Sequence, residues 1–138
     1  DPPMTSADVM DLLGIPWTPG GRDARVGLDC YGLIVELYER AGLRAPSLSA
    51  PSVMDDVPQL CLDILASLAD FWDPLQSPED MALVSLPSPW FKDGVHCGVY
   101  LADGVVAHSP MKSGVIFEPW DRVRPRARGI YRLKAARS

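Results

Sequence analysis

The feature that most constrains the fold of this chain is a change in hydrophobic period near its middle. Up to residue 72 the apolar residues recur at the spacing of helix faces, and beyond it they form short segments with the two-residue period of strands. Helices followed by antiparallel strands make an α+β domain in which the helices cover one face of the sheet. The sequence therefore predicts a single α+β domain over residues 1–138, with N-terminal helices packed on an antiparallel β-sheet.

Three helices are expected in the first half of the chain. One fits residues 7–13 and another fits residues 29–41, and a glycine that can end the helix follows each of them. A third fits residues 55–72, where Asp73-Pro74 stops it because the residue before a proline avoids the helical conformation. Residues 15–21 are rich in proline and glycine, so they predict a loop between the first two helices.

Short segments with alternating apolar residues occupy the second half of the chain. Turn-forming residues separate these segments, and this spacing is typical of antiparallel strands. Asp103-Gly104 lies between two of them and predicts a tight hairpin. The strands are expected over residues 81–86, 95–101, 105–109, 115–117 and 130–133.

Composition and charge exclude several classes of protein. Hydrophobic residues make up 47% and charged residues 22% of the chain, so disorder and fibrous repeats are excluded. No apolar run approaches the ~18 residues of a transmembrane helix, and the N-terminus shows no signal peptide. The net charge of −5 argues against nucleic-acid binding, and three cysteines are too few for a disulfide scaffold. We expect synthesis in a reducing compartment such as the cytoplasm.

The C-terminal segment, residues 121–138, departs from this acidic balance with seven basic residues against one acid. One interpretation is an exposed strand edge followed by a loose tail. The other is a contact with an anionic partner, such as a cell-wall polymer or a neighbouring subunit. The basic residues of the segment are Arg122, Arg124, Arg126, Arg128, Arg132, Lys134 and Arg137.

Cys30 stands where a glycine-containing loop becomes a helix, which is a position typical of reactive thiols. The unpaired N–H groups and the positive end of the helix dipole favour a thiolate there. The alternative is a buried cysteine that packs like a small apolar residue. We expect that packing role for Cys61, which lies within the apolar stripe of the third helix.

A thiolate nucleophile needs a base, and the chain has only two histidines, His96 and His108. Both lie in predicted strands on either side of the Asp103-Gly104 turn, so they can meet on paired strands. One can act as the base while the other orients it through the far ring nitrogen, as in a Cys–His–polar triad. Packing of both side chains on a half-buried sheet is the alternative.

A metal site would use the same atoms, namely those of Cys30, His96, Cys97 and His108. However, Cys97 should point to the opposite face of its strand from His96, and no CxxC or HxxxH spacing occurs. We therefore expect no metal and no other cofactor.

Three motifs occur in a fixed order along the chain. Residues 29–33 read Asp-Cys-Tyr-Gly-Leu at the start of a helix, residues 96–101 read His-Cys-Gly-Val-Tyr-Leu in a strand, and His108 follows one hairpin later. Residues 13–17 add an upstream Leu-Gly-Ile-Pro-Trp loop, and residues 78–83 add a strand entry. The ordered set resembles the NlpC/P60 family of papain-like cysteine peptidases, which implies the papain-like NlpC/P60 fold.

The resemblance implies roles for particular residues. Cys30 would be the nucleophile, His96 the general base and acid, and His108 the residue that orients His96. Asp29 would contact a free amino group of the substrate. Tyr31 is expected to line the cleft, and Trp17 stands in the loop that often supplies a tyrosine to the oxyanion hole. Asp29, Tyr31 and Trp17 are therefore the expected substrate-binding residues.

The resemblance also implies a substrate, since members of this family typically hydrolyse the bond after γ-D-glutamate in peptidoglycan stem peptides. Residues 55–72 and 114–119 look most like the branch found in bacteriophage tail-assembly proteins and prophage particles. We expect phage tail proteins as partners, and a place in the cytoplasm after synthesis or in a virion tail acting at the cell wall. The alternatives are a non-catalytic tail-assembly or binding module, and an amidase or acyltransferase that uses the same thioester.

Overall fold

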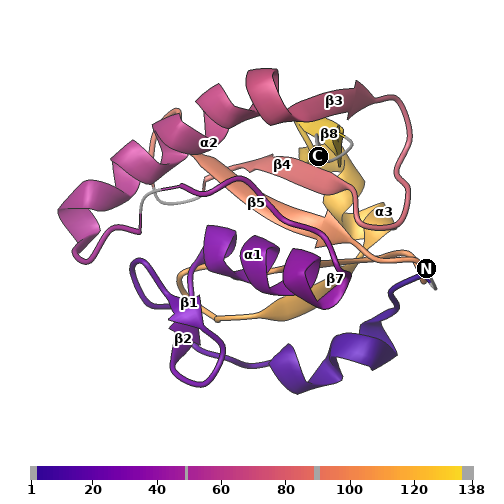
Figure 1. Cartoon of the computed structure of the whole chain (residues 1–138), viewed down its shortest axis with the longest axis horizontal. Coiled ribbons are helices and arrows are strands. Elements are labelled where there is room, and N and C mark those ends of the chain that lie inside the picture. The colour runs from indigo at the N-terminus through magenta and orange to yellow at the C-terminus, as the bar shows by residue number, and fades with distance from the viewer. Residues whose placement is uncertain (1–2, 49, 89–90, 135–138) are drawn as a thin grey trace.

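A six-stranded antiparallel sheet with helices packed on it forms the core of the protein (Figure 1). The computed structural model describes residues 3–48, 50–88 and 91–134. The strand order in the sheet is β3-β8-β4-β5-β6-β7. The predicted α+β class is confirmed. The strands are β3 (Trp72–Leu75), β4 (Leu83–Pro87), β5 (Val95–Tyr100), β6 (Val105–His108), β7 (Ile116–Pro119) and β8 (Gly129–Leu133).

The N-terminal half contains the expected helices with one change of type. The first is a 3₁₀ helix, η1 (Ser6–Leu12), with a kink at Val9, where φ is −125°. The second is α1 (Cys30–Arg40), which matches the prediction. Two strands of two residues each were not predicted, because so short a segment shows no periodicity. These are β1 (Arg22–Asp23) and β2 (Gly27–Leu28), which pair with each other.

The third helix ends one residue earlier than predicted, and the chain then forms a strand. A short 3₁₀ turn, η2 (Met54–Asp56), leads into α2 (Val57–Phe71). Asp73-Pro74 stops the helix as expected, but residues 72–75 then pair with β8 as the edge strand β3. An edge strand tolerates Pro74 because a proline there removes no hydrogen bond from an interior strand.

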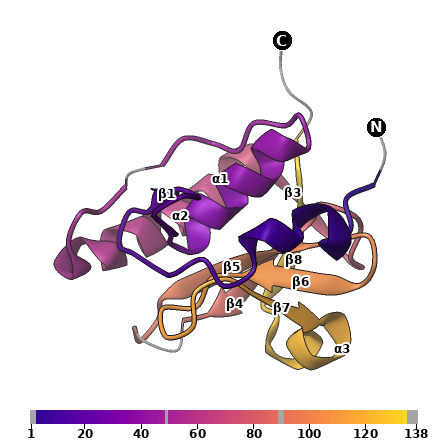
Figure 2. The ribbon, with the colours of Figure 1, turned by 90° about the horizontal axis from the view of Figure 1, so that it is seen from below.

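Helices lie on both faces of the sheet, which is one more face than predicted. α1 and α2 lie on one face, and α3 (Trp120–Val123) lies on the other (Figure 2). A 3₁₀ turn, η3 (Arg124–Arg126), follows α3. α3 was not predicted, because four residues are too few for a helical stripe. No helix in the described part of the chain is long and apolar enough to cross a membrane.

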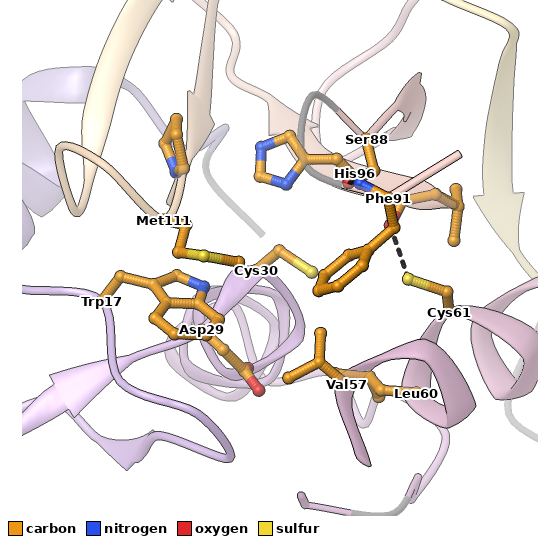
Figure 3. A pocket seen from close by; sticks show the side chains of 12 residues that line it. Trp17, Asp29, Cys30, Val57, Leu60, Cys61, Ser88, Phe91, His96 and Met111 are labelled. Atoms are coloured by element: carbon orange, nitrogen blue, oxygen red, sulfur yellow. Dashed lines mark hydrogen bonds between the residues drawn. The ribbon is translucent and has the colours of Figure 1, made fainter. Parts of the chain in front are cut away.

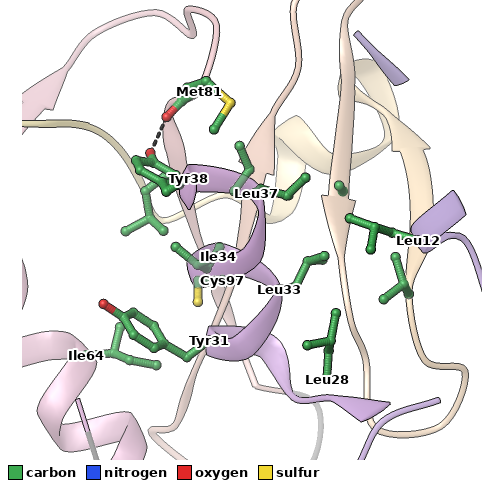
Figure 4. Close-up of a cluster of buried hydrophobic side chains, with 14 of the residues drawn as sticks. Leu12, Leu28, Tyr31, Leu33, Ile34, Leu37, Tyr38, Ile64, Met81 and Cys97 are labelled. Carbon is green, nitrogen blue, oxygen red and sulfur yellow. Dashed lines mark hydrogen bonds between the residues drawn. The ribbon is translucent and has the colours of Figure 1, made fainter. Parts of the chain in front are cut away.

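The main hydrophobic core lies between α1, α2 and the sheet (Figure 4). Leu33, Ile34 and Leu37 are fully buried on the inner face of α1. Tyr38 on the same helix donates a hydrogen bond to the carbonyl of Met81, and its ring meets Trp72 edge to face at 5.6 Å. This packing anchors α1 on the sheet and thereby determines where its N-terminus lies.

Candidate active site

The N-terminus of α1 places Cys30 at the edge of a pocket. Asp29 is the N-cap, and its Oδ1 accepts a hydrogen bond from the Gly32 N–H at 2.7 Å. Cys30 is therefore the first residue of the helix, where the backbone N–H groups have no acceptor within the helix. The predicted position of Cys30 is confirmed.

The Asp29 carboxylate is occupied by the protein itself. It accepts a hydrogen bond from Arg22 Nη1 at 2.5 Å and another from the Gly20 N–H at 3.1 Å. The residue is only 1% exposed, although it lies beside the pocket (Figure 3). These contacts make Asp29 a structural anchor for the loop and the helix, whereas its contact with a substrate amino group stays a prediction.

The Cys30 thiol has an environment that favours its ionised form. A hydrogen bond with the Cys97 thiol and the neighbouring His96 ring outweigh burial and the negative charge of Asp29, and they lower the pKa of Cys30 to about 6. The pKa of Cys97 is raised well above its ordinary value by that hydrogen bond and by burial. Cys97 therefore stays protonated while Cys30 ionises.

The two other cysteines lie in the hydrophobic core. Cys97 is fully buried, with its Sγ 4.0 Å from the carbonyl oxygen of Cys30. Cys61 packs inside α2 with its Sγ 3.4 Å from the carbonyl oxygen of Val95, and burial raises its pKa. The packing role predicted for Cys61 is confirmed, but the contact of Cys97 with Cys30 was not foreseen.

The two histidines meet on adjacent strands, as their spacing predicted. His96 Nε2 lies 2.9 Å from His108 Nδ1. In the register of β5 and β6, His108 stands opposite Gly98, so His96 is its diagonal neighbour on the same face. A Cβ atom at Gly98 would lie 2.8 Å from the carbonyl oxygen of Ala107 and 3.0 Å from His108 Cβ. Glycine is therefore the residue that lets the strands and the histidine come this close.

A glutamate and an arginine continue the chain of contacts beyond His108. His108 Nε2 lies 2.6 Å from Glu118 Oε1, and Arg126 Nη2 lies 2.9 Å from the same oxygen. Glu118 was not predicted as a site residue, because the predicted strand ended at residue 117. The signal that could have found it is the period of two: Glu118 and His108 share one face of the β6–β7 pair.

Burial determines the charge states of this chain of contacts. His108 is only 2% exposed, and burial together with the nearby His96 lowers its pKa to about 4. Burial raises the pKa of Glu118, but the hydrogen bonds from Arg126 and His108 outweigh it, and the pKa is lowered overall. At neutral pH His108 is therefore neutral and Glu118 is ionised.

The pocket around Cys30 is narrow and mostly apolar (Figure 3). Its cavity volume is about 30 Å³, which is room for little more than one water molecule. Trp17 and Met111 lie on one side of Cys30, and Phe91 lies on the other. Trp17 lines the pocket beside Cys30, and its contact with substrate stays a prediction.

Tyr31 does not line this pocket, and the prediction that it does is wrong. Its side chain is 1% exposed and packs in the main core, where the hydroxyl donates a hydrogen bond to the carbonyl of Pro46. The guanidinium of Arg22 lies 5.5 Å from the centre of its ring. The position after Cys30 lies on the inner side of α1, so its side chain turns toward the sheet and α2.

The basic C-terminal segment is partly paired. Arg126 binds Glu118, and Arg132 binds Glu79 through two hydrogen bonds of 2.6 and 2.9 Å. Arg124 and Arg128 are exposed and line a separate groove beside Trp120. Arg137 lies outside the described residues. Among the described residues, no group of three or more His, Cys, Asp or Glu side chains could hold a metal ion.

Comparisons with known proteins agree with the architecture. No protein-family model and no curated protein matches the sequence. Among solved structures, an NlpC/P60 family protein from Bacillus cereus matches with a TM-score of 0.58 and 20% sequence identity. The match covers 95% of this chain and 41% of that one, so this chain spans less than half of its relative's length. The likeness shows that this chain has the fold of an NlpC/P60 protein.

Proposed function

We propose that the protein is a cysteine peptidase that hydrolyses peptide bonds in peptidoglycan stem peptides. The observation that carries this proposal is the position of the Cys30 thiol. It lies at the N-terminus of α1 next to His96, and His96 in turn contacts His108. A thiol with a pKa of about 6 is mostly ionised at neutral pH, whereas an ordinary cysteine is not. The NlpC/P60 fold supports the substrate class, because the family resemblance implies it.

The proposed reaction uses the groups of this site in two steps. The Cys30 sulfur attacks the peptide carbonyl carbon, and the C–N bond breaks as the amine leaves with a proton from His96. The oxyanion formed on the way accepts a hydrogen bond from the Cys30 backbone N–H at the helix N-terminus. Water then hydrolyses the thioester, with His96 taking a proton from it, and the thiol and imidazole are restored.

The finer part of the proposal concerns the bond and the biological setting. We place the cleavage after γ-D-glutamate and assign the protein to a phage tail or prophage particle acting at the cell wall. Support comes from the Asp-Cys-x-Gly-Leu motif, the His-x-Gly-Val-Tyr strand and the resemblance of residues 55–72 and 114–119 to the phage branch.

Digestion of purified peptidoglycan tests the proposal. Wild-type protein should release stem-peptide fragments that mass spectrometry identifies, and Cys30→Ala should release none while keeping its fold. Cys61→Ala is the matched control, because it removes a thiol that also faces the pocket but lies in the core. Equal product release from wild type and Cys30→Ala would refute the assignment of the nucleophile.

The narrow pocket favours a second candidate, a non-catalytic module that binds or assembles through this region. A peptide fits within the pocket of about 30 Å³ only if the pocket widens. Thiol reagents of two sizes separate the candidates. A peptidase should react at Cys30 with both iodoacetamide and a bulky maleimide, whereas a permanently closed module should exclude the maleimide.

A further inference from the structure

We infer that Glu118 is a positioning residue that holds His108 in its Nε2–H tautomer and thereby sets the direction of proton transfer between Cys30 and His96. The inference rests on the proposed function for the role of the Cys30–His96 pair. Its basis is the line of contacts from His96 through His108 to Glu118 and Arg126.

The contact between Glu118 and His108 determines which nitrogen of His108 carries the proton. An ionised carboxylate only accepts hydrogen bonds, so the 2.6 Å contact requires a proton on His108 Nε2. Arg126 keeps Glu118 ionised by donating to the same oxygen at 2.9 Å. The side chain of Glu118 is 15% exposed, and this limited contact with water strengthens the pairing. Glu118 is therefore a fixed acceptor.

The tautomer of His108 in turn determines the tautomer of His96. A neutral imidazole has one N–H group, so His108 with its proton on Nε2 presents a bare Nδ1 that accepts. The 2.9 Å contact then requires His96 Nε2 to be the donor. Neutral His96 consequently has its bare nitrogen at Nδ1, on the other side of the ring. That nitrogen is the one able to take a proton from the Cys30 thiol.

The reverse arrangement of protons leaves the thiol without a base. If His108 carried its proton on Nδ1, then His96 Nε2 would have to accept, and His96 Nδ1 would carry the proton. The ring would then have no free base for Cys30. A doubly protonated His108 is also disfavoured, because burial lowers its pKa to about 4. Its Nδ1–H would also face the His96 Nε2–H, which places two donors together without an acceptor. Only the arrangement set by Glu118 supplies a base.

The same arrangement stabilises the charged product of proton transfer. Once His96 holds the Cys30 proton, its Nε2–H still donates to His108, and the negative charge of Glu118 lies at the far end of the contact chain. Loss of that charge should make the thiolate–imidazolium pair less stable and raise the pKa of Cys30. Cys97 and Asp29 also act on the pKa of Cys30, and a Glu118 variant leaves both in place, so the change is expected through His96.

The experiment compares wild type with Glu118→Gln, whose amide can either donate to His108 Nε2 or accept from it. Long-range ¹H–¹⁵N NMR of the imidazole rings reports the tautomers, and His108→Asn assigns the two rings. Wild-type His108 should be the Nε2–H tautomer, and Glu118→Gln should add a clear Nδ1–H population. The rate of iodoacetamide labelling of Cys30 at pH 6 should fall about fivefold, as expected for a pKa rise near one.

Glu79→Gln is the matched control, because Glu79 also binds an arginine at 2.6 Å but touches no histidine. It should leave both the tautomers and the labelling rate unchanged. A wild-type His108 with its proton on Nδ1 would overturn the inference, even if every variant failed to fold. So would a folded Glu118→Gln protein with wild-type tautomers and labelling. Neither readout uses peptidoglycan, so failure to cleave peptidoglycan would count against the proposed function alone.

Discussion

Removal of the Asp29 side chain tests whether this residue stabilises the site or serves only to bind a substrate. Its carboxylate caps α1 through the Gly32 N–H and binds the guanidinium of Arg22 at 2.5 Å. Loss of an N-cap costs about 1 kcal/mol. Breaking a buried ion pair costs about 3–5 kcal/mol, because the remaining charge is left without its partner.

The structure sets the size of the expected loss. The side chain of Arg22 is 23% exposed, so water compensates part of its lost partner and we reduce the ion-pair contribution to about 2–3 kcal/mol. Asp29→Ala should therefore lower the free energy of unfolding by about 3–4 kcal/mol. Asp29→Asn retains an acceptor for the cap and should lose less. Asp23→Ala is the matched control, since Asp23 pairs with Arg25 on the surface, and it should show no measurable loss.

Urea unfolding followed by tryptophan fluorescence measures these differences. A double-mutant cycle with Arg22→Met should return a clear coupling energy, because both partners of the pair are then removed. A loss below about 1 kcal/mol for Asp29→Ala would refute the anchoring role, since even the cap alone should cost that much. It would favour a carboxylate that is free to bind the amino group of a substrate.

Three further predictions concern the candidate site. The rate of Cys30 labelling by iodoacetamide should be half-maximal near pH 6 and fall as the pH drops through 6, because only the thiolate reacts. A labelling midpoint near pH 9 would mean that Cys30 is an ordinary thiol. His96→Gln should be nearly inactive on peptidoglycan. His108→Asn should keep substantial activity, because its amide oxygen can still accept a hydrogen bond from His96, whereas His108→Ala should lose far more. The reverse order would assign the base to His108. Tyr31→Phe should lower the free energy of unfolding in urea by about 1 kcal/mol, because it removes the hydrogen bond to the Pro46 carbonyl, and it should leave Cys30 labelling unchanged. A change in substrate preference without a loss of stability would mean that Tyr31 lines the cleft.

The sequence by itself determined the elements whose residues repeat with a clear period. α1 was predicted over residues 29–41, because an apolar stripe runs along it and Gly42 follows; Asp29 is its N-cap rather than its first residue. The β5–β6 hairpin was predicted because Asp103-Gly104 lies between two alternating segments, and this placed His96 near His108. Local propensity and periodicity are enough for such features, since each depends on residues that are neighbours in the chain.

Tertiary structure decided what depends on contacts between distant segments. Tyr31 follows Cys30 directly, yet the packing of α1 on the sheet turns its ring into the core. Trp72 looked like the end of a helix stripe but begins an edge strand, because β8, far along the chain, offers it hydrogen bonds. Glu118 gains its place beside His108 only when β7 pairs with β6. A side chain's neighbours across a sheet depend on strand order and register, and these are settled by the whole fold rather than by any local stretch of residues.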